Sequence, residues 1–164
     1  GRDLVVDNKP LEAQFWSLLG DSYNTAKDYA KSDDDYGKVL AINERDVSAL
    51  NNWSYYLSLR GEKLDEAEEM SRKCNELAPG VATYMDTYAW ILYKEGKFAE
   101  ARAEQEKAIK AESDPEGLLL EHYGDILFKL GDTTGAEEQW KKAQAAGGAS
   151  ELIDRKVSEG RLVE

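Results

Sequence analysis

The sequence has few of the residues that catalysis, metal binding and disulfide cross-linking require. Its 164 residues include one cysteine, one histidine and three prolines. The single cysteine, Cys74, cannot form a disulfide within the chain, and it falls in an apolar slot of a helical pattern. There a free cysteine behaves as a small hydrophobic residue. No stretch approaches the roughly 18 apolar residues of a transmembrane helix, so we expect no membrane insertion.

Basic residues are also scarce relative to acidic ones. The chain has 21 lysines and arginines against 33 aspartates and glutamates, which gives a net charge of −12. Such a charge repels phosphate backbones, so nucleic acid is not an expected partner. A basic protein partner is compatible with this charge, and so is the simpler interpretation that the acidic surface keeps the protein soluble.

The sequence lacks a convincing catalytic or metal-binding arrangement. A serine or cysteine nucleophile needs a base to activate it, and the one histidine, His122, is far along the chain from Cys74. Glu121 and Asp125 lie within one helical turn of His122, which makes a metal site conceivable. Zinc sites usually have three or four protein ligands, however, and a lone histidine on an acidic helix is typical of a surface. We therefore expect no enzyme activity, no cofactor and no metal.

What the sequence does contain is a repeat. Gly61, Gly96 and Gly131 are spaced 35 residues apart. An alanine follows each glycine after five or six residues. Each glycine is also preceded by a pair made of an aromatic residue and a small residue. The alanines are Ala67, Ala101 and Ala136, and the pairs are Trp53-Ser54, Tyr88-Ala89 and Tyr123-Gly124. Repeats of this length predict stacked helical hairpins.

The spacing within one unit supports this interpretation. Apolar and small residues in the first half of each unit follow steps of three, one and three, which places them on one face of a helix. The second half repeats the pattern, and the glycine between the halves suits the left-handed residue that ends a helix. No single hairpin can bury its apolar stripe, so the units are expected to stack.

The motifs resemble those of the tetratricopeptide repeat, and the sequences of the third and fourth units are similar to those of bacterial members. The segment W-S-L-L-G-D-S-Y begins at Trp16, and D-T-Y-A-W-I-L-Y-K-E-G-K-F-A-E-A begins at Asp86. The first unit departs from the pattern by having Lys27 for the turn glycine, Ser32 for the alanine and Glu44 for the closing proline. The resemblance implies an all-α, right-handed superhelical solenoid of antiparallel helix pairs, with a capping helix at its C-terminal end.

The alignment predicts four units and two flanking segments. The units are residues 13–46, 47–80, 81–115 and 116–148. Residues 1–12 form a lead-in, in which Leu4, Val5 and Val6 followed by Pro10 read like the tail of an earlier repeat, as in a chain cut from a longer array. Residues 149–164 supply the capping helix, expected to begin at Ser150. The chain starts at Gly1 and not at methionine, so a targeting segment could be missing, which leaves cytoplasm and periplasm open.

The resemblance also implies that the first helix of each unit lines a concave groove. The expected groove residues share a face with helical steps of four and three. They are Asn51, Tyr55 and Ser58, then Asp86, Trp90 and Tyr93, then Glu121, Asp125 and Phe128. Aromatic residues among acids favour a partner with apolar and basic side chains. The alternative is that Trp90, Tyr93 and Phe128 pack against neighbouring helices as core.

We therefore predict a protein–protein interaction module, a scaffold or adaptor that binds a peptide or helix in its groove. The alternative is a structural spacer or a self-association array within a larger protein, including a homo-dimer formed through a terminal repeat.

Overall fold

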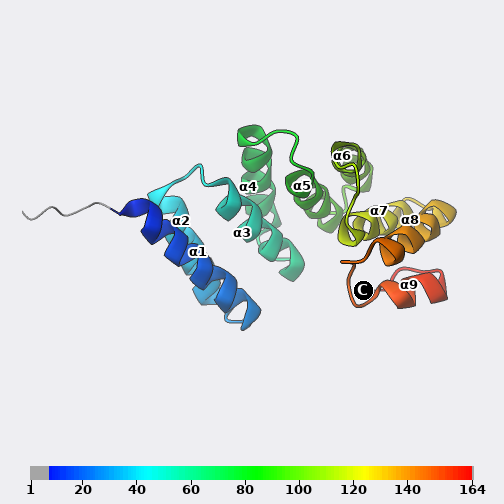
Figure 1. The fold of residues 1–164 in the computed structure, drawn as a ribbon, viewed down its shortest axis with the longest axis horizontal. Helices are drawn as coiled ribbons and strands as arrows, with labels where there is room; N and C mark the ends of the chain where they lie inside the picture. Colours follow the sequence, from blue (N-terminus) through cyan, green and yellow to red (C-terminus); the bar gives the residue numbers. More distant parts are fainter. Residues whose placement is uncertain (1–7, 164) are drawn as a thin grey trace, which may run out of the picture.

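The computed structural model describes residues 8–163, and the chain is all-α over that range. Four antiparallel hairpins stand side by side in chain order, and a short helix follows them (Figure 1). The helices are α1 (Lys9–Thr25), α2 (Tyr29–Ile42), α3 (Val47–Arg60), α4 (Leu64–Leu77), α5 (Ala82–Lys94), α6 (Phe98–Ala111), α7 (Gly117–Lys129), α8 (Thr133–Ala146) and α9 (Ile153–Glu159). Each of the first eight packs most extensively against its hairpin partner, so the described chain is the solenoid that the repeats predict.

The hairpin turns need a left-handed residue, and glycine supplies it in three of the four. Gly61, Gly96 and Gly131 have φ angles of 67°, 80° and 84°. A glycine adopts such angles without the clash that a Cβ atom causes. In the first hairpin Lys27 occupies this place with φ of 61°. The departure seen in the sequence is therefore a strained lysine in an otherwise preserved turn.

Small residues allow the two helices of a hairpin to approach each other closely. A Cβ atom on Gly20 would lie 2.8 Å from Cε2 of Tyr36, and one on Gly124 would lie 2.5 Å from Cδ1 of Trp140. Both rings are fully buried in the second helix of their hairpin. Glycine in the first helix thus makes the space that a large aromatic ring of the second helix fills.

Aromatic and polar contacts join the first two repeats. The Trp53 ring stacks on Tyr36 at a centroid distance of 6.3 Å. Its Nε1 donates a hydrogen bond to Oδ1 of Asp33 at 2.9 Å. Arg60 Nη2 donates to both carboxylate oxygens of Asp33, at 2.8 and 2.9 Å. The same acid on α2 therefore holds two side chains of α3, and aromatic rings fill the space between these repeats.

The first helix starts earlier than the unit boundary expected at residue 13. Helix α1 begins at Lys9, with Pro10 in its first turn. Proline suits this position because its missing N–H would have no partner there. The predicted tail of an earlier repeat at Leu4 to Val6 lies outside the described residues, and the division into four units stays a prediction.

At the other end, the capping helix packs against α8 but starts later than expected. Helix α9 begins at Ile153, and Ser150 does not cap it. The Ser150 hydroxyl donates to Oε1 of Glu121 at 2.6 Å and accepts the Leu152 N–H at 3.2 Å. The Ser150 N–H also donates to Oε2 of Glu121 at 2.7 Å, so these charge-assisted hydrogen bonds hold Ser150 against α7, ahead of the first turn of α9. Among the described helices, none combines the length and apolarity needed to cross a membrane.

Candidate functional site

The structure places the expected groove residues together but buries most of them. They lie on α3, α5 and α7, and α5 contacts both of the others. The buried residues are Asn51, Ser58, Asp86, Trp90, Tyr93, Glu121 and Asp125, while Tyr55 and Phe128 are partly buried. The expectation of an open aromatic stripe is therefore wrong, because neighbouring first helices pack directly on each other and residues after α8 cover α7.

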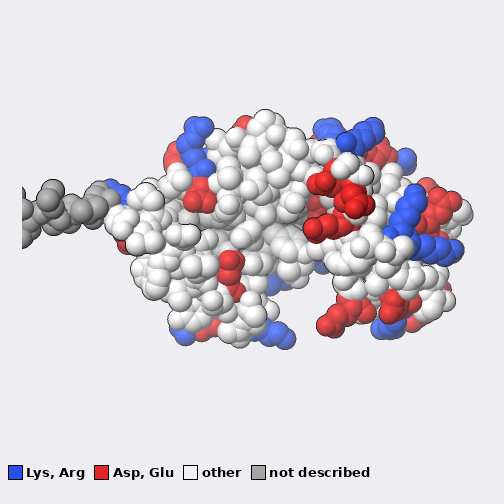
Figure 2. All heavy atoms as spheres, in the orientation of Figure 1, with Lys and Arg blue, Asp and Glu red and all other residues white. Residues whose placement is uncertain are grey.

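A cavity of about 290 Å³ remains on this face. Four expected groove residues line it, namely Tyr55, Trp90, Glu121 and Asp125. The other lining residues are Leu59, Lys94, Leu118, His122, Ser150, Leu152, Lys156 and Val163. The space-filling view shows the molecule indented along its lower edge, between the end of α3 and α9 (Figure 2). Three repeats and the C-terminal segment thus build one site.

The expected residues outside the cavity have structural contacts instead. Ser58 Oγ donates to the Tyr55 carbonyl at 2.6 Å, and Asn51 Nδ2 donates to Oδ1 of Asn52 at 3.2 Å. Phe128 packs on the Trp140 ring at a centroid distance of 5.7 Å. For Phe128 the alternative interpretation as core describes the structure.

Two stacked rings, Trp90 and His122, belong to the wall of the cavity. The Trp90 ring stacks on His122 at 4.0 Å between centroids and on Tyr93, which does not line the cavity, at 4.6 Å. Both pairs are nearly parallel, with interplanar angles of 10° and 16°. His122 is buried, so its expected place on the surface is wrong. The stack fixes the Trp90 ring as a rigid platform at the cavity.

Asp86 contacts His122, one of the stacked rings. His122 Nδ1 lies 3.0 Å from each carboxylate oxygen of Asp86. Gln105 Nε2 donates both to Oδ1 of Asp86 and, at 2.8 Å, to the carbonyl of Leu119. A buried carboxylate is stable only with such partners. Asp86 is therefore a supporting residue that orients His122, and it does not line the cavity.

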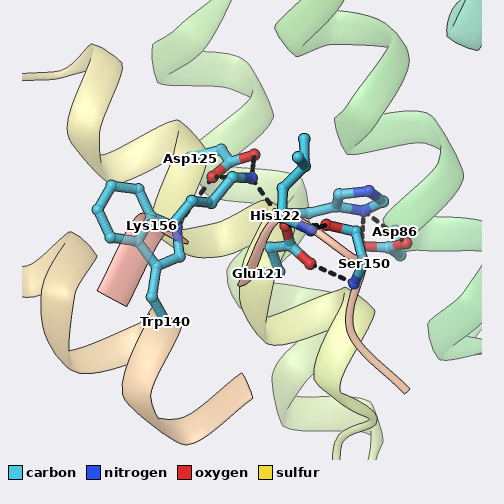
Figure 3. A network of polar contacts seen from close by, with 8 residues as sticks. Asp86, Glu121, His122, Asp125, Trp140, Ser150 and Lys156 are labelled. Atoms are coloured by element: carbon cyan, nitrogen blue, oxygen red, sulfur yellow. Dashed lines mark hydrogen bonds and ion pairs between the residues drawn. The ribbon is translucent and has the colours of Figure 1, made fainter. Parts of the chain in front are cut away.

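The two acidic residues of the cavity already bind a lysine of this chain. Lys156 Nζ, on α9, lies 2.8 Å from Oε1 of Glu121 and 2.9 and 2.7 Å from the two oxygens of Asp125 (Figure 3). Lys156 is only 4% exposed. The acidic stripe thus recognises a lysine, as its composition indicates, but the lysine comes from the capping helix.

The carboxylates of Glu121 and Asp125 also accept hydrogen bonds from groups other than Lys156. The Ser150 N–H donates to Oε2 of Glu121 at 2.7 Å, and Trp140 Nε1 donates to Oδ1 of Asp125 at 2.9 Å. Burial raises the pKa of Asp125, and this effect outweighs the opposing ones of Lys156 and Trp140. For Glu121 burial acts in the same direction, but the hydrogen bonds from Lys156 and Ser150 hold its pKa below the usual value.

Burial also affects the aromatic wall. It raises the pKa of Tyr55 to about 12, with a further contribution from the negative charges of Asp86 and Glu121. Tyr55 is therefore a neutral phenol at physiological pH. It offers the cavity an apolar ring with one polar edge.

The side chains of His122, Glu121 and Asp125 do not converge on one point as a metal site would require. His122 turns its Nδ1 to Asp86, while Glu121 and Asp125 turn to Lys156. Across residues 8–163, no group of three or more histidine, cysteine or acidic side chains is placed to hold a metal ion.

Sequence reasoning missed Lys156 and the apolar part of the cavity, which Leu59, Leu118, Leu152 and Val163 form. A signal for Lys156 was present, because it lies three residues after Ile153 and therefore on the apolar face of the capping helix. A lysine on that face needs a buried acidic partner.

Comparison with known proteins agrees with the architecture. Two family models described as tetratricopeptide repeat match residues 13–46 and 89–151, together more than half of the chain. A TPR repeat-containing protein of Pseudomonas aeruginosa is 30% identical over 109 residues, which are 66% of this chain and 18% of that protein. The chain thus spans less than a fifth of the length of this curated relative.

Solved structures are similar over nearly the whole chain. A tetratricopeptide repeat protein of Parabacteroides merdae matches with a TM-score of 0.77 and 25% identity, over 96% of this chain and 60% of that one. A thermophilic TPR protein of Thermus thermophilus matches in fold, with a TM-score of 0.78 and 14% identity, over 92% and 82% of the two chains. By its matched repeats and its stacked hairpins, this chain belongs to the tetratricopeptide repeat family.

Proposed function

We propose that this chain is a protein–protein interaction module and that the cavity between α3, α5 and α7 receives an apolar side chain of a partner segment. Its volume of about 290 Å³ is large enough for a leucine or an aromatic residue. Leucines and the Tyr55 and Trp90 rings supply the walls. Large aromatic surfaces that are held rigid contribute strongly to binding, because they lose little side-chain entropy.

The single observation that carries the proposal is an exposed leucine at the mouth of this cavity. Leu59 is 49% exposed although it belongs to the lining. Lys94 also lies at the cavity and places its Nζ 5.4 Å from the Trp90 ring centroid. An apolar wall with a few polar groups around it is the usual composition of a ligand pocket.

The partner segment is expected to be apolar with a basic residue. Glu121 and Asp125 lie directly beside the apolar wall, and the contacts of Lys156 are an example of the lysine recognition they offer. A segment with an apolar anchor next to a lysine would match both halves of the site.

Selection of binders from a random peptide library displayed on phage tests the proposal. Selected peptides should share an apolar anchor, and Leu59→Asp should weaken them at least about tenfold, because a charge at the mouth of an apolar cavity is costly to desolvate. Leu130→Asp is the matched control, since Leu130 is 40% exposed and lies outside the cavity. Equal affinity of the two variants would contradict the proposal.

Self-association through the first repeat is the second candidate. Leu11, Phe15 and Leu18 are exposed on one face of α1, at helical steps of four and three. A second copy of the chain could cover this face by a two-fold contact. Light scattering should then show a dimer that Phe15→Ser converts to a monomer, while a monomeric wild type would exclude this candidate.

A further inference from the structure

We infer that the C-terminal segment is a built-in, displaceable ligand: Lys156 holds the acidic half of the cavity in the free protein, and a lysine of the bound segment takes its place. This inference rests on the proposed function, since it concerns the regulation of the same cavity. It implies that α9 is more than an end cap and that binding is coupled to its release.

The contacts of Lys156 are those of a ligand. Its ammonium group reaches two carboxylates on α7, the first helix of the last hairpin, 35 and 31 residues away, and has three oxygens within 2.7 to 2.9 Å. The side chain is 4% exposed. Leu152 and Val163, from the same segment, form part of the cavity wall (Figure 3 shows the polar part). One segment thus supplies both a basic and an apolar group, which is the chemistry proposed for the partner.

The connection to α8 provides a pivot. Gly147 and Gly148 separate α8 from the segment and have φ angles of 77° and 76°. The Gly117 N–H donates to the Gly147 carbonyl at 2.8 Å, which fixes the chain up to that point. Gly148 is the first residue beyond it, and no heavy atom lies within 4 Å of a Cβ atom built there. Glycine in open space allows the backbone to swing at low steric cost.

The segment beyond this pivot is short. Helix α9 has seven residues, and its apolar contacts to the last hairpin come mainly from Ile153, Val157 and the nearby Leu162. A helix of this length depends on tertiary contacts, because isolated helices shorter than roughly 12 residues are marginal in water. Release of the segment therefore breaks these few apolar contacts together with the polar contacts that Ser150 and Lys156 make to α7.

The ionic contacts favour exchange. Taking Lys156 out of water is costly, and the attraction to two carboxylates approximately offsets that cost. A partner segment leaves this balance unchanged if its lysine makes the same contacts and its own N–H or hydroxyl group replaces the Ser150 donors of Glu121. One ammonium group then returns to water as another leaves it. A partner without a basic residue would leave Glu121 and Asp125 buried and unpaired, which is strongly unfavourable. The exchange is therefore selective for a basic segment.

A synthetic peptide with the sequence of residues 149–163 tests the inference in the full chain. The probe measures the rate at which an amine-acylating reagent modifies Lys156, read by mass spectrometry, with the exposed Lys142 as internal reference. Lys156 should be protected in the free protein. Added peptide should raise its acylation rate several-fold relative to Lys142, and the analogue with norleucine in place of its lysine should not.

Lys156→Met provides a second readout that keeps the apolar stem but removes the charge. The lysine peptide should bind this variant about tenfold more tightly than wild type, equivalent to about 1.4 kcal/mol. The norleucine analogue should show no such gain, and Lys142→Met is the matched control. Helical circular dichroism establishes that the variant is folded.

The outcomes separate the two proposals. Protection of Lys156 at every peptide concentration, together with equal affinity of the two peptides for Lys156→Met, would overturn the inference. The proposed function would still stand if library peptides remained sensitive to Leu59→Asp. Loss of that sensitivity would reject the proposed function and the inference that rests on it.

Discussion

His122 Nδ1 lies 3.0 Å from both carboxylate oxygens of Asp86, so that a contact between two buried side chains joins α7 to α5. The same imidazole stacks on Trp90. The pair therefore couples the packing of the third and fourth repeats to the ring that forms the cavity wall.

Removal of this contact should destabilise the fold. His122→Phe keeps a ring on Trp90 but leaves Asp86 with fewer donors, which we expect to cost about 1–3 kcal/mol of unfolding free energy. Urea unfolding followed by circular dichroism measures it. The double variant Asp86→Asn/His122→Phe should regain part of the loss, whereas additive effects would show that the two side chains are not coupled.

Close helix packing predicts opposite effects for two glycine substitutions. Gly124→Ala places a methyl group 2.5 Å from the buried Trp140 ring and should destabilise the protein by about 1–3 kcal/mol. Gly37→Ala, also within a helix, meets nothing within 4 Å and should stabilise it by about 0.5–1 kcal/mol. Thermal unfolding of both variants checks this, and destabilisation of equal size would count against the packing described.

The first turn offers a stabilising change. Lys27 has φ of 61°, which costs a residue with a Cβ atom about 1–2 kcal/mol. Lys27→Gly removes that strain at some cost in chain entropy, so the unfolding free energy should rise by roughly 0.5–1 kcal/mol. Lys142→Gly, in the middle of an exposed helix face, should instead lower it by about 1 kcal/mol. A loss in both variants would contradict the expectation.

The two carboxylates that hold Lys156 should respond oppositely to acid. The folded-state pKa of Glu121 is lowered, so its contribution to stability is present above its usual value of 4.5 and is lost as the pH falls through the folded value. The folded-state pKa of Asp125 is raised above 3.8, so its protonation favours the folded state as the pH falls.

Denaturant titrations between about pH 6 and pH 3 test these signs. The stability advantage of wild type over Glu121→Gln should shrink as the pH falls. The difference between wild type and Asp125→Asn should move in favour of wild type over the same range. Parallel slopes in the two comparisons would refute the assignment.

Cys74 should be chemically inert in the folded protein. It is fully buried in α4, and burial raises the pKa of its thiol to about 11. Since the thiolate is the reactive form, a disulfide reagent at pH 8 should modify it only after unfolding in urea. Rapid modification of the native protein would show that α4 is exposed or open.

The hairpins could be predicted from the sequence because their determinants are local. The turn residues Gly61, Gly96 and Gly131 and the small residues Gly20 and Gly124 act on neighbours within one repeat. Their spacing alone implies the stacking. Even the exception at Lys27 keeps the turn, since the packing of Tyr36 against Gly20 fixes the hairpin around it.

The burial and pairing of the site residues could not be predicted in the same way. Whether Glu121 and Asp125 are open or paired depends on where residues after α8 lie, and no repeat pattern specifies that. Whether Trp90 is exposed depends on His122, one repeat further along the chain, and on the distance between α5 and α7. These are tertiary contacts between side chains that do not follow the repeat period.

The most direct test of the cavity as the interaction site is a map of amide chemical-shift changes on addition of a library-selected peptide. The cavity proposal predicts that the largest changes occur at Tyr55, Leu59, Trp90 and Leu118. Changes confined to the outer face of α1, or to the second helices of the hairpins, would contradict it.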